Sequence, residues 1–284
     1  MIAIVGGLGA AVAFATATLS SSRATKLIGP RSLLSGVMLV GLAITLPAAA
    51  AKGIPAQLDR GSWGWLAISG VGNVAGLLCA YAALRTGKVG IVAPIVSTEG
   101  AIAAVIAVIA GESISPGAAA TLAVIAAGIL LAAISRERVR ESASIRLGTR
   151  PLIFSIVAAL AFGVSLYATG RIGATLPVAW AVLPARVVGV AAVALPLALS
   201  SGLRITRAAL PYVVLSGVCE IAGFGLFTIG ARHGLAVSAV LSSQFAALAA
   251  LAAYVLFRER LARVQLAGVV AIVLGVAVLS GLQA

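Results

Sequence analysis

Long apolar stretches alternate with short polar connections along the whole 284-residue chain. A helix that crosses the hydrocarbon core of a membrane needs about 20 predominantly apolar residues. Ten stretches are of this kind: 2–21, 32–50, 64–84, 89–110, 117–134, 152–171, 177–200, 209–230, 235–257 and 263–281. The pattern therefore predicts an all-α membrane protein with ten transmembrane helices.

The polar connections are too short to hold a separate soluble domain. Several contain glycine and proline, which are typical of turns. The longest polar stretch, 136–150, separates the first five apolar stretches from the last five. We expect a single transmembrane domain, 1–284, in which 1–135 forms a first five-helix unit and 152–284 forms a second.

The two halves of the chain resemble each other in sequence. Matching positions differ by a constant 147 residues: Ser69-Gly70-Val71 with Ser216-Gly217-Val218, Ala75-Gly76 with Ala222-Gly223, Arg85 with Arg232, Glu112 with Glu259, and Gly128 with Gly275. The first helices match at an offset of 148 residues, through Phe14 with Phe162 and Arg23 with Arg171. A constant offset over three helices indicates an internal repeat.

Each repeat contains an odd number of predicted helices, so the second copy enters the membrane from the opposite side. Inverted repeats of this kind are typical of secondary transporters, whose substrate site lies near the middle of the membrane between the repeats. We therefore expect two inverted five-helix repeats around a central cavity.

Each predicted repeat ends in a short glutamate-bearing turn and a last helix that contains glycine. The turns are Gly111-Glu112-Ser113 and Arg258-Glu259-Arg260, followed by Gly128 and Gly275. In these features the chain resembles the drug/metabolite transporter superfamily, and it is most similar there to the ten-helix bacterial exporters of amino acids, especially aromatic ones. The resemblance implies a basket-like bundle and alternating access between the repeats. Ser113 departs from the usual Glu-Arg turn, which weakens an ionic role at that turn.

Composition and charge narrow the class of protein. Hydrophobic residues make up 62% of the chain and charged residues 10%, against about 45–50% and 25% in soluble domains, which excludes a water-soluble protein. The net charge of +13 does not indicate nucleic-acid binding, because the cations lie singly between apolar stretches. Two cysteines and one histidine, His233, are too few for a metal centre. No catalytic motif is visible, and we expect no cofactor, no metal and no enzymatic activity.

Basic residues also predict the orientation of the bundle. Counting Lys and Arg in alternate connections places fifteen on one face and four on the other, and these four are Lys52, Arg60, Arg171 and Arg232. Because short loops rich in Lys and Arg remain in the cytoplasm, the first face is expected there. Both termini are then periplasmic, and we expect a multi-pass protein of the bacterial inner membrane.

Ionisable side chains inside predicted helices are the first candidate site residues, because charge in the membrane interior is costly. Three are present: Glu99, Arg186 and Glu220. The repeat offset pairs Glu220 with Asn73, which places these two at equivalent depths. Two interpretations remain open. The charges could form an ion pair that holds helices together, or they could line a cavity in which Arg186 and a glutamate bind the two charged ends of an amino acid.

Uncharged polar and aromatic residues complete the candidate site. Ser243 and Gln244 lie in the ninth predicted helix. Five aromatic residues could form walls of the cavity, or could only pack between helices or lie at the membrane interface: Phe14, Tyr81, Tyr167, Trp180 and Phe245. Pro94 lies inside the fourth predicted helix, where its ring removes a backbone hydrogen bond and favours a kink.

The sequence predicts a transporter that exports amino acids or related small metabolites through the lipid bilayer. Facilitated export down the substrate gradient is expected, because Arg186 is available to balance a buried glutamate. The one histidine, His233, lies away from the middle of the membrane and provides no proton relay through the bundle. The alternative is proton-coupled efflux of hydrophobic compounds, with Glu99 or Glu220 as the proton carrier. A membrane scaffold and an intramembrane enzyme are alternatives from other classes, and purified protein in liposomes separates them: a scaffold moves no solute, and an enzyme converts it.

Overall fold

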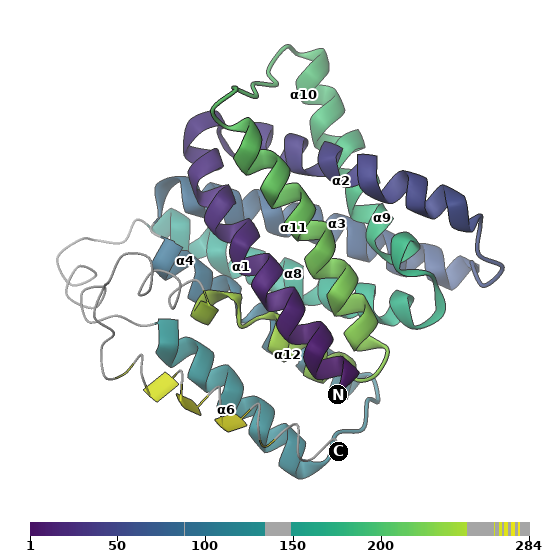
Figure 1. Cartoon of the computed structure of the whole chain (residues 1–284), viewed down its shortest axis with the longest axis vertical. Helices are drawn as coiled ribbons and strands as arrows, with labels where there is room; N and C mark the ends of the chain where they lie inside the picture. Colours follow the sequence, from purple (N-terminus) through teal and green to yellow (C-terminus); the bar gives the residue numbers. More distant parts are fainter. Residues whose placement is uncertain are drawn as a thin grey trace.

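The computed structural model describes residues 1–87, 89–133 and 149–248, together with eight single positions between 264 and 278. Its helices are, in chain order, α1 (Ile2–Ile28), α2 (Pro30–Lys52), α3 (Arg60–Thr86), α4 (Val89–Val96), α5 (Glu99–Ile109), α6 (Pro116–Ala133), α8 (Thr149–Thr175), α9 (Val178–Gly189), the π-helix η1 (Val190–Ala194), α10 (Leu195–Leu199), α11 (Leu210–Ala231) and α12 (Leu235–Ser242). No strand occurs among these residues (Figure 1). The predicted all-α class is confirmed.

The described helices match nine of the ten predicted segments. Seven spans are long and apolar enough to cross a membrane, and Pro116–Gly128 and Leu235–Leu248 are shorter apolar helices. The tenth predicted segment, 263–281, lies largely outside the described residues, as does Glu259. The protein is thus a multi-pass helical membrane protein, and the count of ten helices stays a prediction.

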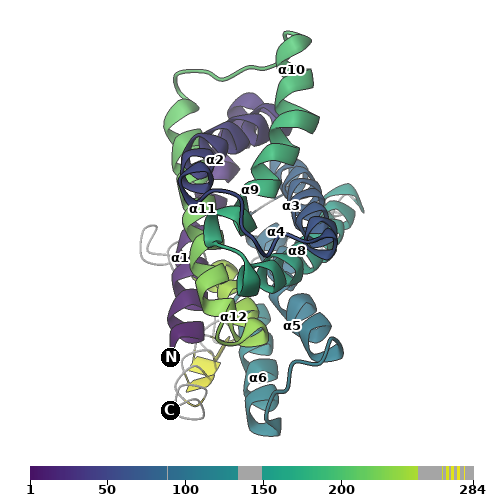
Figure 2. The same ribbon diagram turned by 90° about the vertical axis from the view of Figure 1, so that its right-hand side faces the viewer.

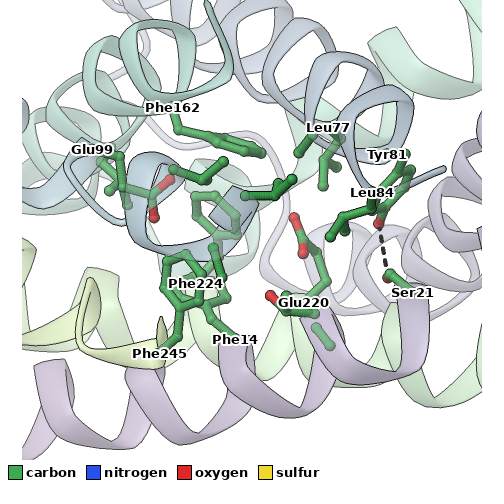
Figure 3. A pocket seen from close by; sticks show the side chains of 17 residues that line it. Phe14, Ser21, Leu77, Tyr81, Leu84, Glu99, Phe162, Glu220, Phe224 and Phe245 are labelled. Atoms are coloured by element: carbon green, nitrogen blue, oxygen red, sulfur yellow. Dashed lines mark hydrogen bonds between the residues drawn. The ribbon is translucent and has the colours of Figure 1, made fainter. Parts of the chain in front are cut away.

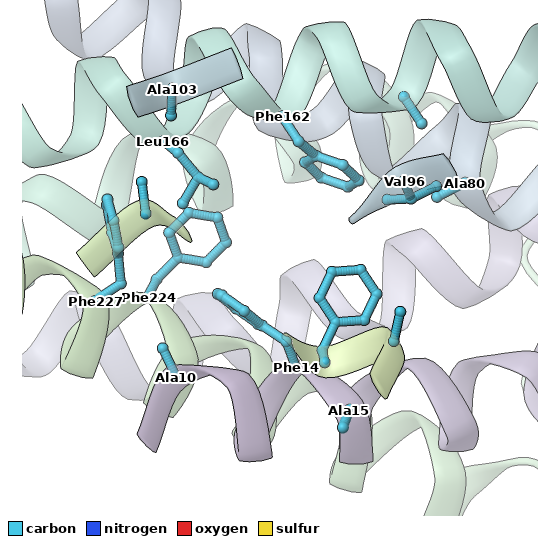
Figure 4. Packing of buried hydrophobic residues seen from close by; sticks show 14 of the residues in the cluster. Ala10, Phe14, Ala15, Ala80, Val96, Ala103, Phe162, Leu166, Phe224 and Phe227 are labelled. Atoms are coloured by element: carbon cyan, nitrogen blue, oxygen red, sulfur yellow. The ribbon is translucent and has the colours of Figure 1, made fainter. Parts of the chain in front are cut away.

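The first helix of each half packs along the third helix of the other half. α1 packs along α11, and α3 packs along α8 (Figure 1). The Phe14 ring of α1 lies against Gly223 of α11, where an added Cβ would lie 2.6 Å from Phe14 Cδ1. In the same way Phe162 of α8 lies against Gly76 of α3, where a Cβ would lie 2.6 Å from Phe162 Cδ1. Both rings belong to the buried apolar cluster (Figure 4), and the repeat offsets relate one contact to the other.

A hydrogen bond recurs in these two interfaces. The Ser21 hydroxyl of α1 donates to Ser216 Oγ of α11 at 3.1 Å. The hydroxyls of Thr169 in α8 and Ser69 in α3 lie 2.6 Å apart. Ser21 corresponds to Thr169, and Ser69 to Ser216, at the offsets of 148 and 147 residues. Helix α8 is therefore the counterpart of α1, and α11 is the counterpart of α3.

Where the repeats meet, equivalent residues touch each other. Asn73 Nδ2 donates to Glu220 Oε1 at 3.5 Å, across 147 residues of sequence. Arg186 Nη1 lies 3.6 Å from Met38 Sδ, across 148 residues. Residues related by a two-fold axis touch each other only beside that axis. These two contacts therefore mark a pseudo-two-fold axis through the bundle, and they bring Asn73 and Glu220 to the same depth, as the repeat offset predicts.

The fourth predicted helix, 89–110, is divided into α4 and α5 by Ser97 and Thr98. Pro94, near the end of α4, lacks a backbone N–H. The hydroxyls of Ser97 and Thr98 donate to backbone carbonyls three residues back, at 2.8 and 2.7 Å. Such bonds offer the backbone an alternative to helical pairing. The structure thus has a break where the sequence predicts a kink.

The equivalent helix of the second half is also discontinuous. α12 is followed by a turn at Ser243 and Gln244 before the helix resumes, and the Ser243 hydroxyl donates to the Val240 carbonyl at 2.8 Å. The predicted helix 177–200 comprises α9, η1 and α10. Serine and threonine thus lie at breaks in two spans, and a third span is continuous but contains a π-helical segment.

The two discontinuous helices cross close to their breaks. α5 packs on α12 at one end of the bundle (Figure 2). Gly100, in the first turn of α5, is the contact point: an added Cβ would lie 2.5 Å from Ser243 Oγ and would overlap the Ala239 carbonyl oxygen. Only glycine allows this approach without moving the backbone of α12.

Two carboxylates accept hydrogen bonds at the starts of helices, one at α12 and one at α3. Glu112, in the turn after α5, accepts a hydrogen bond from the Ala236 backbone N–H at the start of α12, at 3.2 Å, and so ties the first half to the second. Asp59 caps α3 by accepting hydrogen bonds from the Ser62 hydroxyl and the Ser62 backbone N–H, both at 2.7 Å. These bonds lower the pKa of Asp59.

Substitution of Gly100 tests the crossing of α5 and α12. We expect Gly100→Ala to lower the free energy of unfolding by about 1–3 kcal/mol, because the methyl group overpacks against backbone. Unfolding is followed by circular dichroism during an SDS titration in mixed micelles. Gly64→Ala in α3 is the matched control: nothing lies within 4 Å of its added Cβ, and it should stabilise the helix slightly. Equal stabilities of the two variants would contradict the close crossing.

Candidate functional site

A cavity lies between the two repeats (Figure 3), and the space within it, including space open to solvent, is about 620 Å³. The first half lines it with α1, α3, α4 and α5. The second half lines it with α8, α11 and the residue Phe245 that follows the α12 break. Both repeats therefore contribute walls to the cavity.

The cavity wall is mainly apolar and rich in aromatic rings. Five aromatic side chains line it: Phe14, Tyr81, Phe162, Phe224 and Phe245. Phe14 and Phe224 pack edge to face, with ring centroids 5.3 Å apart. Phe14 and Phe162 are also the rings that fill the glycine contacts of the two equivalent interfaces. The symmetric packing of the repeats thus builds part of the cavity wall.

Two carboxylates, those of Glu99 and Glu220, line the same cavity (Figure 3). Glu99 is the first residue of α5, directly after the helix break, and Glu220 lies in the middle of α11. Only 6% of Glu99 and 5% of Glu220 is exposed. A charged group in apolar surroundings needs an opposite charge, hydrogen-bond donors or a ligand, so the partners of each carboxylate decide what the site can bind.

Arg186 pairs with Glu220 behind the cavity wall. Its Nη1 lies 3.9 Å from Glu220 Oε1, and its guanidinium lies over the Phe224 ring, 5.8 Å from the centroid. Asn73 donates to the same carboxylate oxygen. Arg186 is completely buried and is not among the residues that line the cavity. The structure therefore favours the ion-pair interpretation for Arg186 over the cavity-wall interpretation.

Glycine makes room for Arg186 beside the pseudo-two-fold axis. An added Cβ at Gly41 would lie 2.6 Å from Arg186 Cδ, and one at the equivalent Gly189 would lie 2.6 Å from Met38 Sδ. Among the described residues, Nε and Nη2 of Arg186 and Oδ1 of Asn73 find no hydrogen-bond partner. With so few other partners, the guanidinium depends on the Glu220 carboxylate.

Glu99 differs from Glu220 in its surroundings. The described part of the chain contains an ion-pair partner for Glu220 and none for Glu99. The repeat offset pairs Glu99 with Ala246, so the second half supplies no equivalent carboxylate. The cavity wall therefore carries one carboxylate that Arg186 balances and one that it does not.

Among the predicted aromatic residues, Phe14 and Phe245 line the cavity and Tyr167 does not. Tyr81 also lines the cavity. Its Oη lies 3.4 Å from Ser21 Oγ, which links it to the α1–α11 interface (Figure 3). Phe162 and Phe224 also line the cavity, although neither is predicted as a site residue. The equivalence of Phe162 and Phe14 in the repeat is the signal that points to Phe162, and Phe224 has no comparable signal.

The predicted site residues that do not line the cavity are Asn73, Arg186, Trp180, Ser243 and Gln244. Trp180 packs against Leu66 in a separate apolar cluster, and its Nε1–H donates to the Gly53 carbonyl at 2.9 Å. Ser243 and Gln244 are buried at the α12 break, directly before the cavity residue Phe245, and are not themselves part of the lining. Trp180 is accordingly a packing residue in this structure, and the two polar residues shape the helix break.

The remaining chemically active side chains form no second site. Among the residues that the structure describes, no three His, Cys, Asp or Glu side chains lie close enough to hold a metal ion. His233 is exposed just after α11, and Cys79 and Cys219 are half-buried free thiols. The cavity with Glu99 and Glu220 is therefore the candidate functional site.

Fold and cavity define the class: an all-α, multi-pass membrane protein built from two repeats around a central cavity. Residues 1–134, just under half of the chain, match the EamA-like transporter family. A solved structure titled "Crystal structure of protein" is similar with a TM-score of 0.73 and 19% identity, over 99% of this chain and 96% of that one. No curated protein matches the chain. The family match agrees with the resemblance to drug/metabolite transporters, and the structural likeness shows a shared fold.

The buried ion pair predicts an asymmetric response to mutation. Arg186→Met places in the second repeat the residue that the first repeat has at Met38. It should lower the free energy of unfolding by about 3–5 kcal/mol, because the Glu220 carboxylate loses its counterion. The double variant Arg186→Met/Glu220→Gln should recover most of this loss. SDS titration measures both variants, and a double variant as unstable as the single one would contradict the pairing.

Proposed function

We propose that this protein is a transporter that moves small solutes across the bacterial inner membrane by alternating access. The observation that carries the proposal is the cavity between the two repeats, with Glu99 and Glu220 in its wall. A scaffold protein gains nothing from a carboxylate in an apolar cavity, whereas a transporter needs a polar group there to bind its substrate. The match of residues 1–134 to a transporter family supports the same conclusion.

The pseudo-two-fold axis supports alternating access. Equivalent helices pack through equivalent contacts, such as Phe14 on Gly223 and Phe162 on Gly76. Two repeats with the same internal contacts can exchange conformations, and the exchange turns a state open to one face into a state open to the other. The breaks in the fourth helix of each repeat lie at the cavity and provide positions where the halves of these helices can tilt.

The proposed cargo is a small metabolite that carries an amino group. Glu99 is the side chain placed to bind an ammonium group, and the phenylalanine rings provide an apolar surface for the rest of the molecule. Amino acids, which the sequence resemblance favours, belong to this class. Their carboxylate would have to reach Arg186, which is buried behind Glu220 and Phe224.

Proton-coupled efflux of hydrophobic compounds is the second candidate, and one observation favours it. Coupling requires a carboxylate that gains and loses a proton during the transport cycle. Arg186 pairs with Glu220, whereas the described residues provide no cation for Glu99. Glu99 is therefore the proton carrier in this mechanism, and the facilitated mechanism requires no such exchange.

Purified protein in liposomes tests transport and its coupling together. We expect liposomes loaded with a panel of unlabelled amino acids and amines to accumulate the matching labelled solute by counterflow at equal pH on both sides. Liposomes without protein, and proteoliposomes without substrate inside, are the controls. Absence of counterflow for every solute, with folded protein, would contradict the transport function.

The same liposomes separate the two mechanisms. A facilitator moves substrate down its own gradient without an imposed pH difference, and Glu99→Gln changes only how well substrate binds. If flux appears only after a pH step, and Glu99→Gln abolishes that dependence, the facilitated mechanism is wrong and proton coupling through Glu99 replaces it.

A further inference from the structure

The charged side chains among the described residues of the cavity wall are both acidic. Among the described residues that line it, two are acidic and none is basic. The polar remainder consists of the hydroxyls of Thr18, Ser21 and Tyr81. A negatively charged group on a substrate would therefore meet carboxylates and hydroxyls, and no positive side chain at the surface of the cavity.

The two carboxylates are not equally available to a substrate. Glu220 Oε1 is occupied by Arg186 at 3.9 Å and by Asn73 at 3.5 Å. The described residues place no cation at Glu99, although it lines the same cavity. Among the described residues, the wall and the groups directly behind it thus carry two acidic side chains and one basic one. One carboxylate remains to be balanced, and it is that of Glu99.

Aromatic rings surround the space between the two carboxylates. Figure 3 shows Phe162, Phe224, Phe14 and Phe245 lying between Glu99 and Glu220 in this view. The face of an aromatic ring attracts a cation, and its apolar surface accepts the hydrocarbon or ring of an organic molecule. Rings and an unbalanced carboxylate together form a site for an organic cation.

We propose that the substrate bound in this cavity is an organic monocation: an amine on an aromatic or aliphatic body that lacks a carboxylate. Its ammonium group pairs with Glu99, and its body lies among the phenylalanine rings. The inference rests on the proposed transport function and narrows its cargo. An amino acid is disfavoured, because its carboxylate would lie in a wall that is already negative, while Arg186 is committed to Glu220.

Four ligands of similar shape and different charge test the inference on the purified full chain in detergent. Labelled 2-phenylethylamine, which is protonated at pH 7, is the probe. We expect unlabelled 2-phenylethylamine to displace it, and phenylalanine, 3-phenylpropionate and 2-phenylethanol to require at least about tenfold higher concentrations. These ligands share the ring and differ in charge, so the comparison requires no mutation. Equal displacement by phenylalanine and by the amine would overturn the inference.

A charge-removing variant assigns the binding to Glu99. Glu99→Gln keeps the shape of the side chain and should weaken binding of 2-phenylethylamine at least about tenfold. Asp59→Asn is the matched control, because it removes the same charge from an exposed helix cap outside the cavity and should leave binding unchanged. Size-exclusion chromatography verifies that both variants remain folded. Wild-type affinity in folded Glu99→Gln would contradict the role of Glu99.

Counterflow distinguishes failure of this inference from failure of the transport function. If liposomes accumulate phenylalanine and not 2-phenylethylamine, transport stands and the monocation inference is wrong. If the amine binds in a Glu99-dependent manner but no solute moves, the recognition stands and the transport function is wrong. The inference is supported when the amine both binds and moves, and phenylalanine does neither at the same concentration.

Discussion

The ion pair of Arg186 and Glu220 is the constraint on which the centre of this structure depends. A guanidinium and a carboxylate inside a membrane are tolerated only together, since either one alone would be an uncompensated buried charge. Their contact fixes α9 against α11. Gly41 in α2 leaves room for the guanidinium, and Asn73 in α3 completes the surroundings of the carboxylate. One pair of charges thus holds together four helices from both halves of the bundle.

The pair also shows how an asymmetric site is built on a symmetric frame. At the pseudo-two-fold axis the first repeat supplies Met38 and Asn73, where the second supplies Arg186 and Glu220. The charges therefore belong to the second repeat, and the first repeat contributes Glu99 on the other side of the cavity. Packing contacts are equivalent in the two repeats, whereas the charges are not. The packing of the two repeats is therefore symmetric, whereas the charged side chains around the cavity are arranged asymmetrically.

Much of the frame could be predicted from the sequence, because hydropathy and the repeat offset are both properties of the chain. Nine apolar segments are helical in the structure, and the offset of 147 residues brings Asn73 to Glu220. The candidate site was less predictable. The depth of a residue in the membrane follows from its position along the transmembrane helix. The direction in which its side chain points depends on how the helices pack against each other. For this reason Tyr81 lines the cavity and Trp180 does not.

The helix breaks could not be predicted from hydropathy, because serine and threonine are compatible with a continuous membrane helix even when their hydroxyls bond to its backbone, as Ser35 and Thr45 do in α2. Ser97 and Thr98 form such bonds beside Pro94, and Gly100 then allows α5 to lie against α12. The consequence is that Glu99 stands at the start of a half-helix facing the cavity. The helix break thus positions the cavity carboxylate for which the described residues provide no cation.

Accessibility of the cavity to both faces of the membrane is the central claim, and cysteine labelling measures it most directly. Thr18 lines the cavity, so Thr18→Cys is introduced into a chain in which Cys79 and Cys219, the two native cysteines, are replaced by serine. Membrane-impermeant thiol reagents are then added either outside or inside oriented proteoliposomes. The account predicts that Thr18→Cys is modified from each side, and that a substrate amine slows both reactions. Modification from one side only, with or without substrate, would contradict it.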